Sequence, residues 1–258
     1  VRPENPFFAR ALVNRYWAHF FGRGIVEMPD DMRVSNPPSN APLLDALAKD
    51  FSGHKYDLKH LIRTICASRT YQLSSAANLH NKKDKQNFAR FYARRLPAEV
   101  LFDAIDQSTG VPARFVAFKG GKVGGGTAKT GALRAIELPD EAVKTPLLVT
   151  FGKPERRTAC ECERSNAATL MQSLYLLSSP ELHAKLKDKS ARPARLAADP
   201  RPVADKIREI YLWVYARPPS EDELRTVRDY LSAEGSRREA YEDVFWALMN
   251  TKEFLFNH

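Results

Sequence analysis

Near its start, the sequence places an apolar residue at every fourth position, and this spacing constrains the segment to a helix with one buried face. The residues of the apolar stripe are Phe8, Leu12, Val13, Tyr16, Trp17 and Phe20. Asn5 is a preferred N-cap, and Pro6 suits the first helical position. Gly22 and Gly24 follow the stripe and can end a helix. We therefore predict a helix over residues 6–21 that packs against a core.

Helical spacing and capping residues recur along the chain. Asp57 is a preferred N-cap, and Ser220 with Glu223 matches a capping box, in which each side chain bonds the backbone of the other residue. By contrast, the segment 185–201 is basic and poor in large apolar residues, which indicates a surface connection. The further predicted helices span residues 41–52, 58–65, 84–94, 97–107, 166–177, 202–215 and 220–232, and a last one carries Tyr241, Val244, Phe245 and Leu248.

Two short runs have the composition of strands. They cover residues 133–138 and 147–151, and we expect them to pair as a small sheet or hairpin. The apolar density of the first and last helices, Trp246 included, places both in the core. The sequence therefore predicts a mainly α fold, a multi-helix assembly with a minor β-hairpin or short sheet, formed as a single helical domain over residues 1–258.

A Gly/Lys-rich segment interrupts the helical pattern at residues 119–131. Six of the 12 glycines of the chain lie there, with Lys119, Lys122 and Lys129 between them. The segment shows neither helical nor strand periodicity. We therefore predict an exposed, mobile loop.

The charge and hydropathy of the chain limit the kinds of partner that we expect. The net charge of +9 favours nucleic acid, anionic polysaccharide or an anionic membrane surface, and a basic surface without a cognate polyanion explains it equally well. No run of about 18 apolar residues is present, so we expect no membrane-spanning segment. The chain begins at Val1 rather than Met, and we expect it to be a piece of a longer protein.

Sequence motifs of the common enzyme classes are absent. The chain contains no G-x-S-x-G, no phosphate-binding G-x-x-x-x-G-K-[ST] and no H-E-x-x-H. It also lacks C-x-x-C-H, so we expect no haem to be attached within this segment. The basic, aromatic stretch 82–95 resembles a nucleic-acid surface. However, Phe88, Phe91 and Tyr92 have the spacing of a core-facing stripe, and we favour a core position for them.

The three cysteines include a close pair, Cys160 and Cys162. Two thiolates at this spacing are weak candidates for metal ligands, because no second Cys/His pair completes a known signature. We favour buried, reduced thiols in an ordered segment near the core, and we assign no metal. Cys66 is the third cysteine, and its pairing with either of the others stays open.

Several polar residues are candidates for a binding site. His19 lies at the edge of the first apolar stripe, where a half-buried, hydrogen-bonded histidine is the more common outcome than a ligand or a base. Glu99, Asp103 and Asp106 share one helix face, and we interpret them as structural charges rather than a cation site. The candidate binding residues are Asn14, His19, Arg94, Arg95, Glu99, Glu163 and Arg164. Catalytic residues are not identified.

Long strings in the sequence resemble a family. The strings are NPFFARA at 5–11, NRYWAHFFGRG at 14–24, YDLKHLIR at 56–63, SRTYQLS at 68–74, FGKPER at 151–156 with CECERS at 160–165, and NTKEFLFNH at 250–258. They resemble the planctomycete-type C-terminal "PSD" domain of unknown function, which is found in proteins with a planctomycete cytochrome c domain. The resemblance covers nearly the whole chain.

The resemblance implies an exported multidomain protein, extracytoplasmic in the periplasm or at the cell surface. It also implies an upstream domain with haem c, and an oxidising compartment for the two close cysteines. The family carries no established activity. We therefore expect an accessory domain, for binding or scaffolding, linked to cytochrome c-type redox chemistry or polysaccharide processing. Its expected partners are the upstream domains of the same polypeptide and an anionic polysaccharide.

Two other functions stay open. One is a hydrolase or oxidoreductase with a polar site around His19, Arg95, Glu99, Glu163 and Arg164. The other is non-specific binding of nucleic acid or another polyanion through the excess positive charge, and we do not expect nucleic acid as the main partner.

Overall fold

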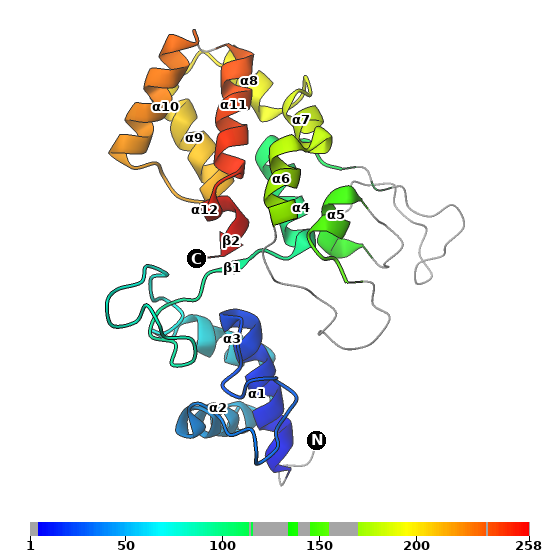
Figure 1. Ribbon diagram of the computed structural model, residues 1–258, viewed down its shortest axis with the longest axis vertical. Helices are drawn as coiled ribbons and strands as arrows, with labels where there is room; N and C mark the ends of the chain where they lie inside the picture. The colour runs from blue at the N-terminus through cyan, green and yellow to red at the C-terminus, as the bar shows by residue number, and fades with distance from the viewer. Residues whose placement is uncertain are drawn as a thin grey trace, which may run out of the picture. The chain divides into compact units, whose positions relative to one another are not determined.

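The computed structural model of the chain describes residues 5–113, 115, 134–138, 145–154, 170–235 and 237–257 (Figure 1). These residues form helices, turns and a two-stranded sheet, so the mainly α prediction is confirmed. They divide into two compact units, one ending at Arg94 and one over Arg95–Asn257. The prediction of one domain over 1–258 stays a prediction. Within the described ranges, every helix is too short or too polar to span a membrane.

The N-terminal unit contains three helices that the sequence predicts well. They are α1 (Pro6–Phe21), α2 (Ala41–Gly53) and α3 (Leu58–Cys66). The Asn5 side chain accepts hydrogen bonds from two amides of the first turn of α1, and Asp57 does the same for α3. Gly22 ends α1 with φ 76°, a left-handed conformation that glycine adopts without steric cost.

The core of the N-terminal unit is built on one line of α1. Val13, Trp17 and Phe21 are almost fully buried, whereas the other members of the predicted stripe are half-buried beside them: Phe8, Leu12, Tyr16 and Phe20. The Trp17 and Phe21 rings stack with centroids 4.2 Å apart, and the Phe88 ring meets each of them edge-on at 5.4 Å. The buried side chains of α2 and α3 complete this cluster: Leu44, Leu47, Phe51, Leu61 and Ile65.

The helix predicted over residues 84–94 is wrong. The Asp84 carboxylate accepts hydrogen bonds from the backbone N–H groups of residues 86, 87 and 89 and from the Tyr92 hydroxyl. This local capture of amides competes with helix formation. Phe88 has φ 54° and is buried, as is Phe91, so the core position predicted for these two residues is confirmed although the segment is not helical.

The remaining elements begin with β1, which spans the boundary residues Arg94 and Arg95, and all later elements belong to the C-terminal unit. β1 (Arg94–Arg95) pairs with β2 (Phe256–Asn257), and the Leu96 N–H donates to the Leu255 carbonyl at 2.9 Å. The helices are α4 (Ala98–Thr109), the 3-10 helix η1 (Ala135–Glu137), α5 (Pro146–Thr150), α6 (Leu170–Ser178), α7 (Pro180–Leu186), α8 (Arg192–Ala198), α9 (Val203–Tyr215), α10 (Glu221–Ala233), α11 (Arg238–Met249) and α12 (Lys252–Leu255).

The core of the C-terminal unit lies between α4, α5, α9 and α11. Its largest fully buried side chains are Phe102, Phe151, Tyr241 and Phe245. The helices α9, α10 and α11 lie beside one another (Figure 1), and α8 packs on α11. The first and last long helices of the chain therefore belong to separate apolar clusters.

The strands predicted at 133–138 and 147–151 are wrong. The Asp103 carboxylate accepts hydrogen bonds from the Ala135 and Ile136 amides, which starts the turn of η1. Thr145 caps α5, and Pro146 occupies its first turn. A short apolar run does not distinguish a strand from a buried helical turn by its spacing alone. The minor sheet forms elsewhere, from β1 and β2.

The surface connection predicted at 185–201 is also wrong, because it contains α8. Ala191, Pro193 and Leu196 are buried, and the Arg192 guanidinium lies 3.3 Å from the centre of the Trp213 ring. The small residues of this segment allow close packing on α11, which compensates for its few large apolar side chains. The loop predicted at 119–131 lies outside the described residues.

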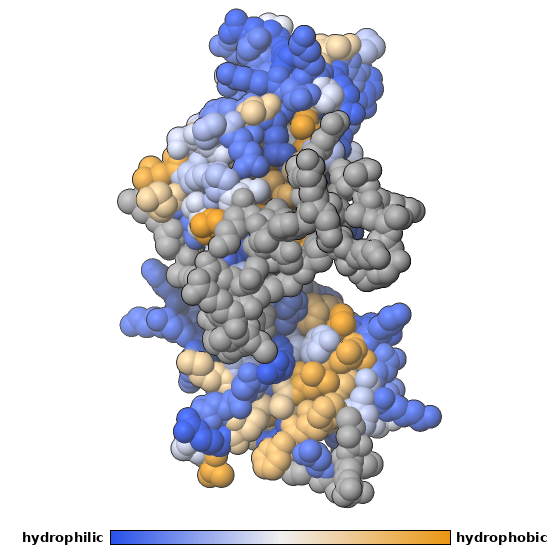
Figure 2. Space-filling model, turned by 90° about the vertical axis from the view of Figure 1, so that its right-hand side faces the viewer, coloured by the Kyte–Doolittle hydropathy of each residue, from blue (hydrophilic) through white to orange (hydrophobic). Residues whose placement is uncertain are grey.

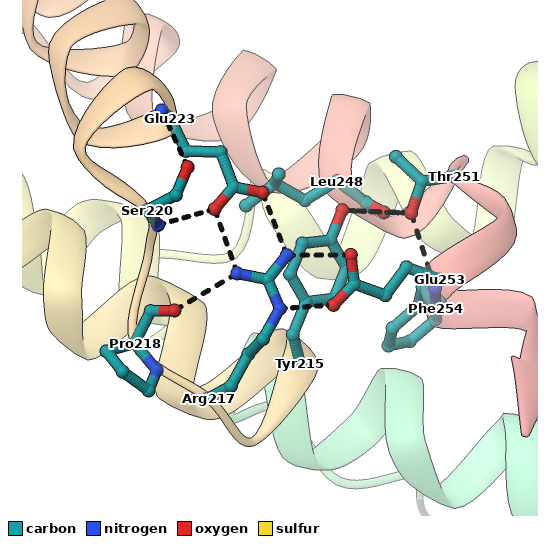
Figure 3. A network of polar contacts seen from close by, with 9 residues as sticks. All are labelled: Tyr215, Arg217, Pro218, Ser220, Glu223, Leu248, Thr251, Glu253 and Phe254. Atoms are coloured by element: carbon teal, nitrogen blue, oxygen red, sulfur yellow. Dashed lines mark hydrogen bonds and ion pairs between the residues drawn. The ribbon is translucent and has the colours of Figure 1, made fainter. Parts of the chain in front are cut away.

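A network around Arg217 fixes the ends of three helices (Figure 3). The Arg217 guanidinium donates to both carboxylate oxygens of Glu223 at the start of α10, at 2.8 Å each. It also donates to both oxygens of Glu253 in α12, at 2.6 and 2.8 Å. Glu223 closes the predicted capping box with Ser220, which is confirmed. One guanidinium thus ties the end of α9 to α10 and α12.

We expect Arg217→Lys to lower the free energy of unfolding by about 1–2 kcal/mol, because an ammonium does not form two parallel pairs of hydrogen bonds with carboxylates. Urea unfolding followed by circular dichroism measures this. Arg225→Lys is the matched control, since Arg225 makes one exposed pair with Asp222, and its loss should stay below about 0.5 kcal/mol. Equal losses in the two variants would contradict the assigned role.

The same network predicts a pH dependence. The hydrogen bonds from Arg217 lower the pKa of Glu223 from 4.5 to about 2. Its carboxylate therefore contributes stability that is complete above pH 4.5 and is lost as the pH falls from 4.5 towards 2. We expect the difference in unfolding free energy between the native chain and Glu223→Gln, about 1–2 kcal/mol at pH 7 after allowance for solvent screening, to shrink over this range. A difference that is constant from pH 6 to pH 3 would contradict it.

Candidate functional site

The residues predicted to form a site are distributed over both units. Asn14, His19 and Arg94 belong to the N-terminal unit, and Arg95 and Glu99 to the C-terminal unit. Four more candidates, Cys160, Cys162, Glu163 and Arg164, lie outside the described residues. Their roles stay predictions.

Asn14 is a structural residue of the N-terminal unit. Its side chain is fully buried, donates to the carbonyls of Val26 and Pro29, and accepts from the Val26 amide at 2.9 Å. A Cβ atom at Gly24 would lie 2.9 Å from the Asn14 amide group, so only glycine fits this close approach. Asn14 therefore holds the chain that follows α1, and its amide faces protein rather than solvent.

His19 and Arg94 come together through the backbone. His19 is exposed on α1, and its carbonyl oxygen accepts a hydrogen bond from the Arg94 guanidinium. Burial lowers the pKa of Arg94. The His19 ring meets the Phe20 ring edge-on at 5.3 Å. The contact therefore uses the backbone at the helix end. The imidazole is exposed, so the half-buried position predicted for His19 is wrong.

Arg95 and Glu99 are buried at the start of α4. The Arg95 guanidinium donates to the Phe151 carbonyl at 3.0 Å and lies 5.3 Å from the centre of the Phe151 ring. These contacts join the start of α4 to the end of α5. Arg95 therefore connects the start of α4 to α5 within the protein.

A buried ion pair joins α4 to α7. Lys185 lies 2.7 Å from Asp106, and it also donates to the Val111 carbonyl at 3.0 Å. Burial raises the pKa of Asp106, although the hydrogen bond from Lys185 opposes the shift, and burial also raises the pKa of Glu181 beside the pair. Buried acids with raised pKa values are common in active sites. Here, however, the surrounding side chains leave no volume for even a water molecule, so the pair is structural.

A groove of about 320 Å³ lies between α7 and α11. Its lining residues are His183, Leu186 and Lys187 on one side and Glu242, Asp243 and Trp246 on the other. The Glu242 carboxylate accepts from Arg238 at 2.6 Å, and the Asp243 carboxylate accepts from the Tyr230 hydroxyl at 2.8 Å. Both carboxylates are thus held in place and keep further acceptor capacity.

Trp246 gives this groove its aromatic wall. The helical spacing of α11 directs Tyr241 and Phe245 into the core, whereas Glu242 and Trp246, four residues apart, line the groove. The Trp246 indole N–H is buried and has no acceptor among the described residues. The sequence analysis assigned Trp246 to the core, and the structure places it at the core's edge, half-buried.

A second polar cluster lies in the N-terminal unit, where α2 turns into α3. Asp50, His54 and His60 bring one ligand atom each to within 4.8 Å of the other two. The His60 Nε2 atom lies 2.8 Å from the Asp50 carboxylate. This cluster was not predicted from the sequence, although the spacing of Asp50 and His54, four residues apart, was a signal.

One face of the N-terminal unit is apolar. Figure 2 shows orange, hydrophobic residues gathered on the visible face of this unit. The unit exposes several large apolar side chains, among them Phe7, Met28 and Val34. Apolar areas of this kind commonly mark contacts with other proteins or segments.

The comparisons with known proteins identify a family and no characterised relative. No curated protein and no solved structure matches the chain. The family model PSD1, described as a protein of unknown function (DUF1553), matches residues 1–231. This match covers most of the chain, and it agrees with the resemblance seen in the sequence. The chain therefore belongs to the PSD1 family of proteins of unknown function.

Proposed function

We propose that the chain is an accessory binding module, and that the groove between α7 and α11 binds a neutral sugar chain. The observation that carries this proposal is the groove itself, in which an aromatic wall and fixed hydrogen-bonding groups face one space. An indole face suits the C–H groups of a sugar ring, and carboxylates accept hydrogen bonds from its hydroxyls.

The state of the carboxylates favours binding over turnover. Glu242 is paired with Arg238, and Asp243 is hydrogen-bonded to Tyr230. A general acid requires a carboxyl group whose proton is available to a substrate. Acceptors that are held in place by neighbours instead orient a ligand.

The charge of the groove favours a neutral ligand. Glu242 and Asp243 oppose only Lys187 among the charged residues that line it, so the excess of positive charge on the chain lies elsewhere. An anionic polysaccharide, predicted from net charge, would meet two carboxylates here. It remains a separate prediction for the basic surface, as does weak binding of nucleic acid.

The wider context follows from the resemblance described above. We propose that the module acts within a larger extracytoplasmic polypeptide, together with upstream domains that include one with haem c. In a protein linked to redox chemistry or polysaccharide processing, a sugar-binding module would hold the polymer near the domain that acts on it. The apolar face of the N-terminal unit would suit contact with such a domain.

We expect the full chain to be retarded in native gels that contain a neutral polysaccharide, such as xylan or a soluble β-glucan, and Trp246→Phe to weaken this binding about 5- to 10-fold. Trp213→Phe is the matched control, because Trp213 lies under Arg192 and is not among the residues that line the groove.

Two results would contradict the proposal. One is an absence of retardation in every neutral gel, and another is an equal effect of the two tryptophan variants. Retardation by alginate alone, abolished by moderate salt, would indicate polyanion binding through the basic surface instead of a groove ligand.

A further inference from the structure

We propose that Asp50, His54 and His60 form a binding site for a divalent transition-metal ion, with Zn²⁺ as the best match. The site lies in the N-terminal unit and is independent of the sugar-binding proposal, which concerns the C-terminal unit. It is also separate from the cysteine pair considered in the sequence analysis.

The chain holds the three side chains on fixed elements. Asp50 lies in the last turn of α2, His54 is its C-cap residue, and His60 lies in the first turn of α3. The reversal between these helices is tight, because Lys55 and Tyr56 both adopt positive φ angles, 56° and 61°. Such conformations persist only where the surroundings determine them.

The core anchors this reversal. The Tyr56 ring meets the buried Phe51 ring edge-on at 5.4 Å and the Phe8 ring at 5.5 Å. The Tyr56 N–H donates to the Phe51 carbonyl at 3.0 Å, and Asp57 caps the start of α3. The backbone positions of His54 and His60 are therefore set by packing in α1, α2 and α3.

The distances fit a small ion. The Asp50 carboxylate lies 2.8 Å from His60 Nε2 and 3.3 Å from His54 Nδ1. Zinc bonds to nitrogen and oxygen are about 2.0–2.2 Å long, so tetrahedral ligand atoms lie roughly 3.3–3.6 Å apart. The imidazole rings stack with centroids 3.7 Å apart and nearly parallel planes. Because a metal ion lies in the plane of each imidazole that ligates it, at least one ring must turn out of the stack when both bind one ion.

The donor set selects the class of metal. Two imidazole nitrogens and one carboxylate suit Zn²⁺ and related transition ions, whereas Mg²⁺ and Ca²⁺ prefer oxygen ligands throughout. The side chains of Asp50, His54 and His60 are 37, 51 and 28% exposed. Solvent therefore reaches the site, and a bound ion would keep at least one position for water or for a ligand from another molecule.

A role in folding explains the cluster less well. Neither histidine belongs to the apolar core of the unit. The His54 Nδ1 atom lies 2.9 Å from the Asp50 carbonyl, but the backbone N–H of His54 already bonds that same carbonyl. Because a carbonyl oxygen only accepts hydrogen bonds, Nδ1 carries the ring proton in this contact and must release it to ligate a metal ion.

The test is a titration of the full, metal-stripped chain with Co²⁺ and then Zn²⁺. We expect one Co²⁺ per chain, visible d–d absorption typical of four or five ligands, no thiolate charge-transfer band, and displacement by Zn²⁺. His60→Gln and His54→Gln should each weaken binding at least about tenfold. His80→Gln is the matched control, since His80 is exposed in the same unit and lies outside the cluster.

The choice of variants keeps the test decisive. His54→Gln changes the most exposed of the three side chains, so it carries the test if His60→Gln fails to fold. A chain with Cys160→Ser and Cys162→Ser should bind as the native chain does. The proposal is overturned by an absence of saturable binding, by unchanged affinity in His54→Gln, or by loss of binding in the cysteine variant.

Discussion

The arrangement of the last helices depends on one guanidinium. Arg217 follows α9 and bonds two carboxylates from different elements, Glu223 in α10 and Glu253 in α12, with two hydrogen bonds to each. Each pair is partly exposed, so its free energy is modest. The geometry is nevertheless restrictive, because the planar guanidinium donates paired hydrogen bonds to a carboxylate only within its own plane.

The network extends from Arg217 to α11, which carries one wall of the groove. The Tyr215 hydroxyl contacts the Thr251 hydroxyl at 2.9 Å and donates to the Leu248 carbonyl at the end of α11 (Figure 3). Burial raises the pKa of Tyr215, because it disfavours the charged phenolate. The position of Trp246, two residues before Leu248, is therefore set by the same contacts that close the C-terminal unit.

Local chemistry explains which elements the sequence predicts. The helices capped by Asn5, Asp57 and Ser220 were predicted with nearly correct bounds, because these side chains satisfy amides within three residues. A cap alone was not sufficient, since α5 is capped by Thr145 and was predicted as a strand. Two of the wrong predictions concern segments in which a carboxylate accepts hydrogen bonds from backbone amides. Asp84 prevents a helix in its own segment, and Asp103 turns a segment more than thirty residues away. The second effect has no local signal in the sequence.

The candidate sites were harder to predict, because burial depends on tertiary packing. Asn14 and Arg95 were predicted as binding residues. In the structure, both side chains are buried and form hydrogen bonds with backbone groups of other segments. The groove joins α7 to α11, and its residues are separated by about sixty positions. The cluster of Asp50, His54 and His60 had a readable pattern, with Asp50 and His54 one helical turn apart and His60 at the start of the next helix.

The central claim is that a neutral sugar chain contacts Trp246 in the groove. The three tryptophans of the chain give three indole N–H signals in a nitrogen–proton correlation spectrum, which single Trp→Phe variants assign. On addition of a neutral oligosaccharide, the account predicts that the Trp246 signal shifts in a saturable way while those of Trp17 and Trp213 stay in place. A Trp246 signal that does not move while the chain binds the sugar, or a shift confined to another tryptophan, would contradict it.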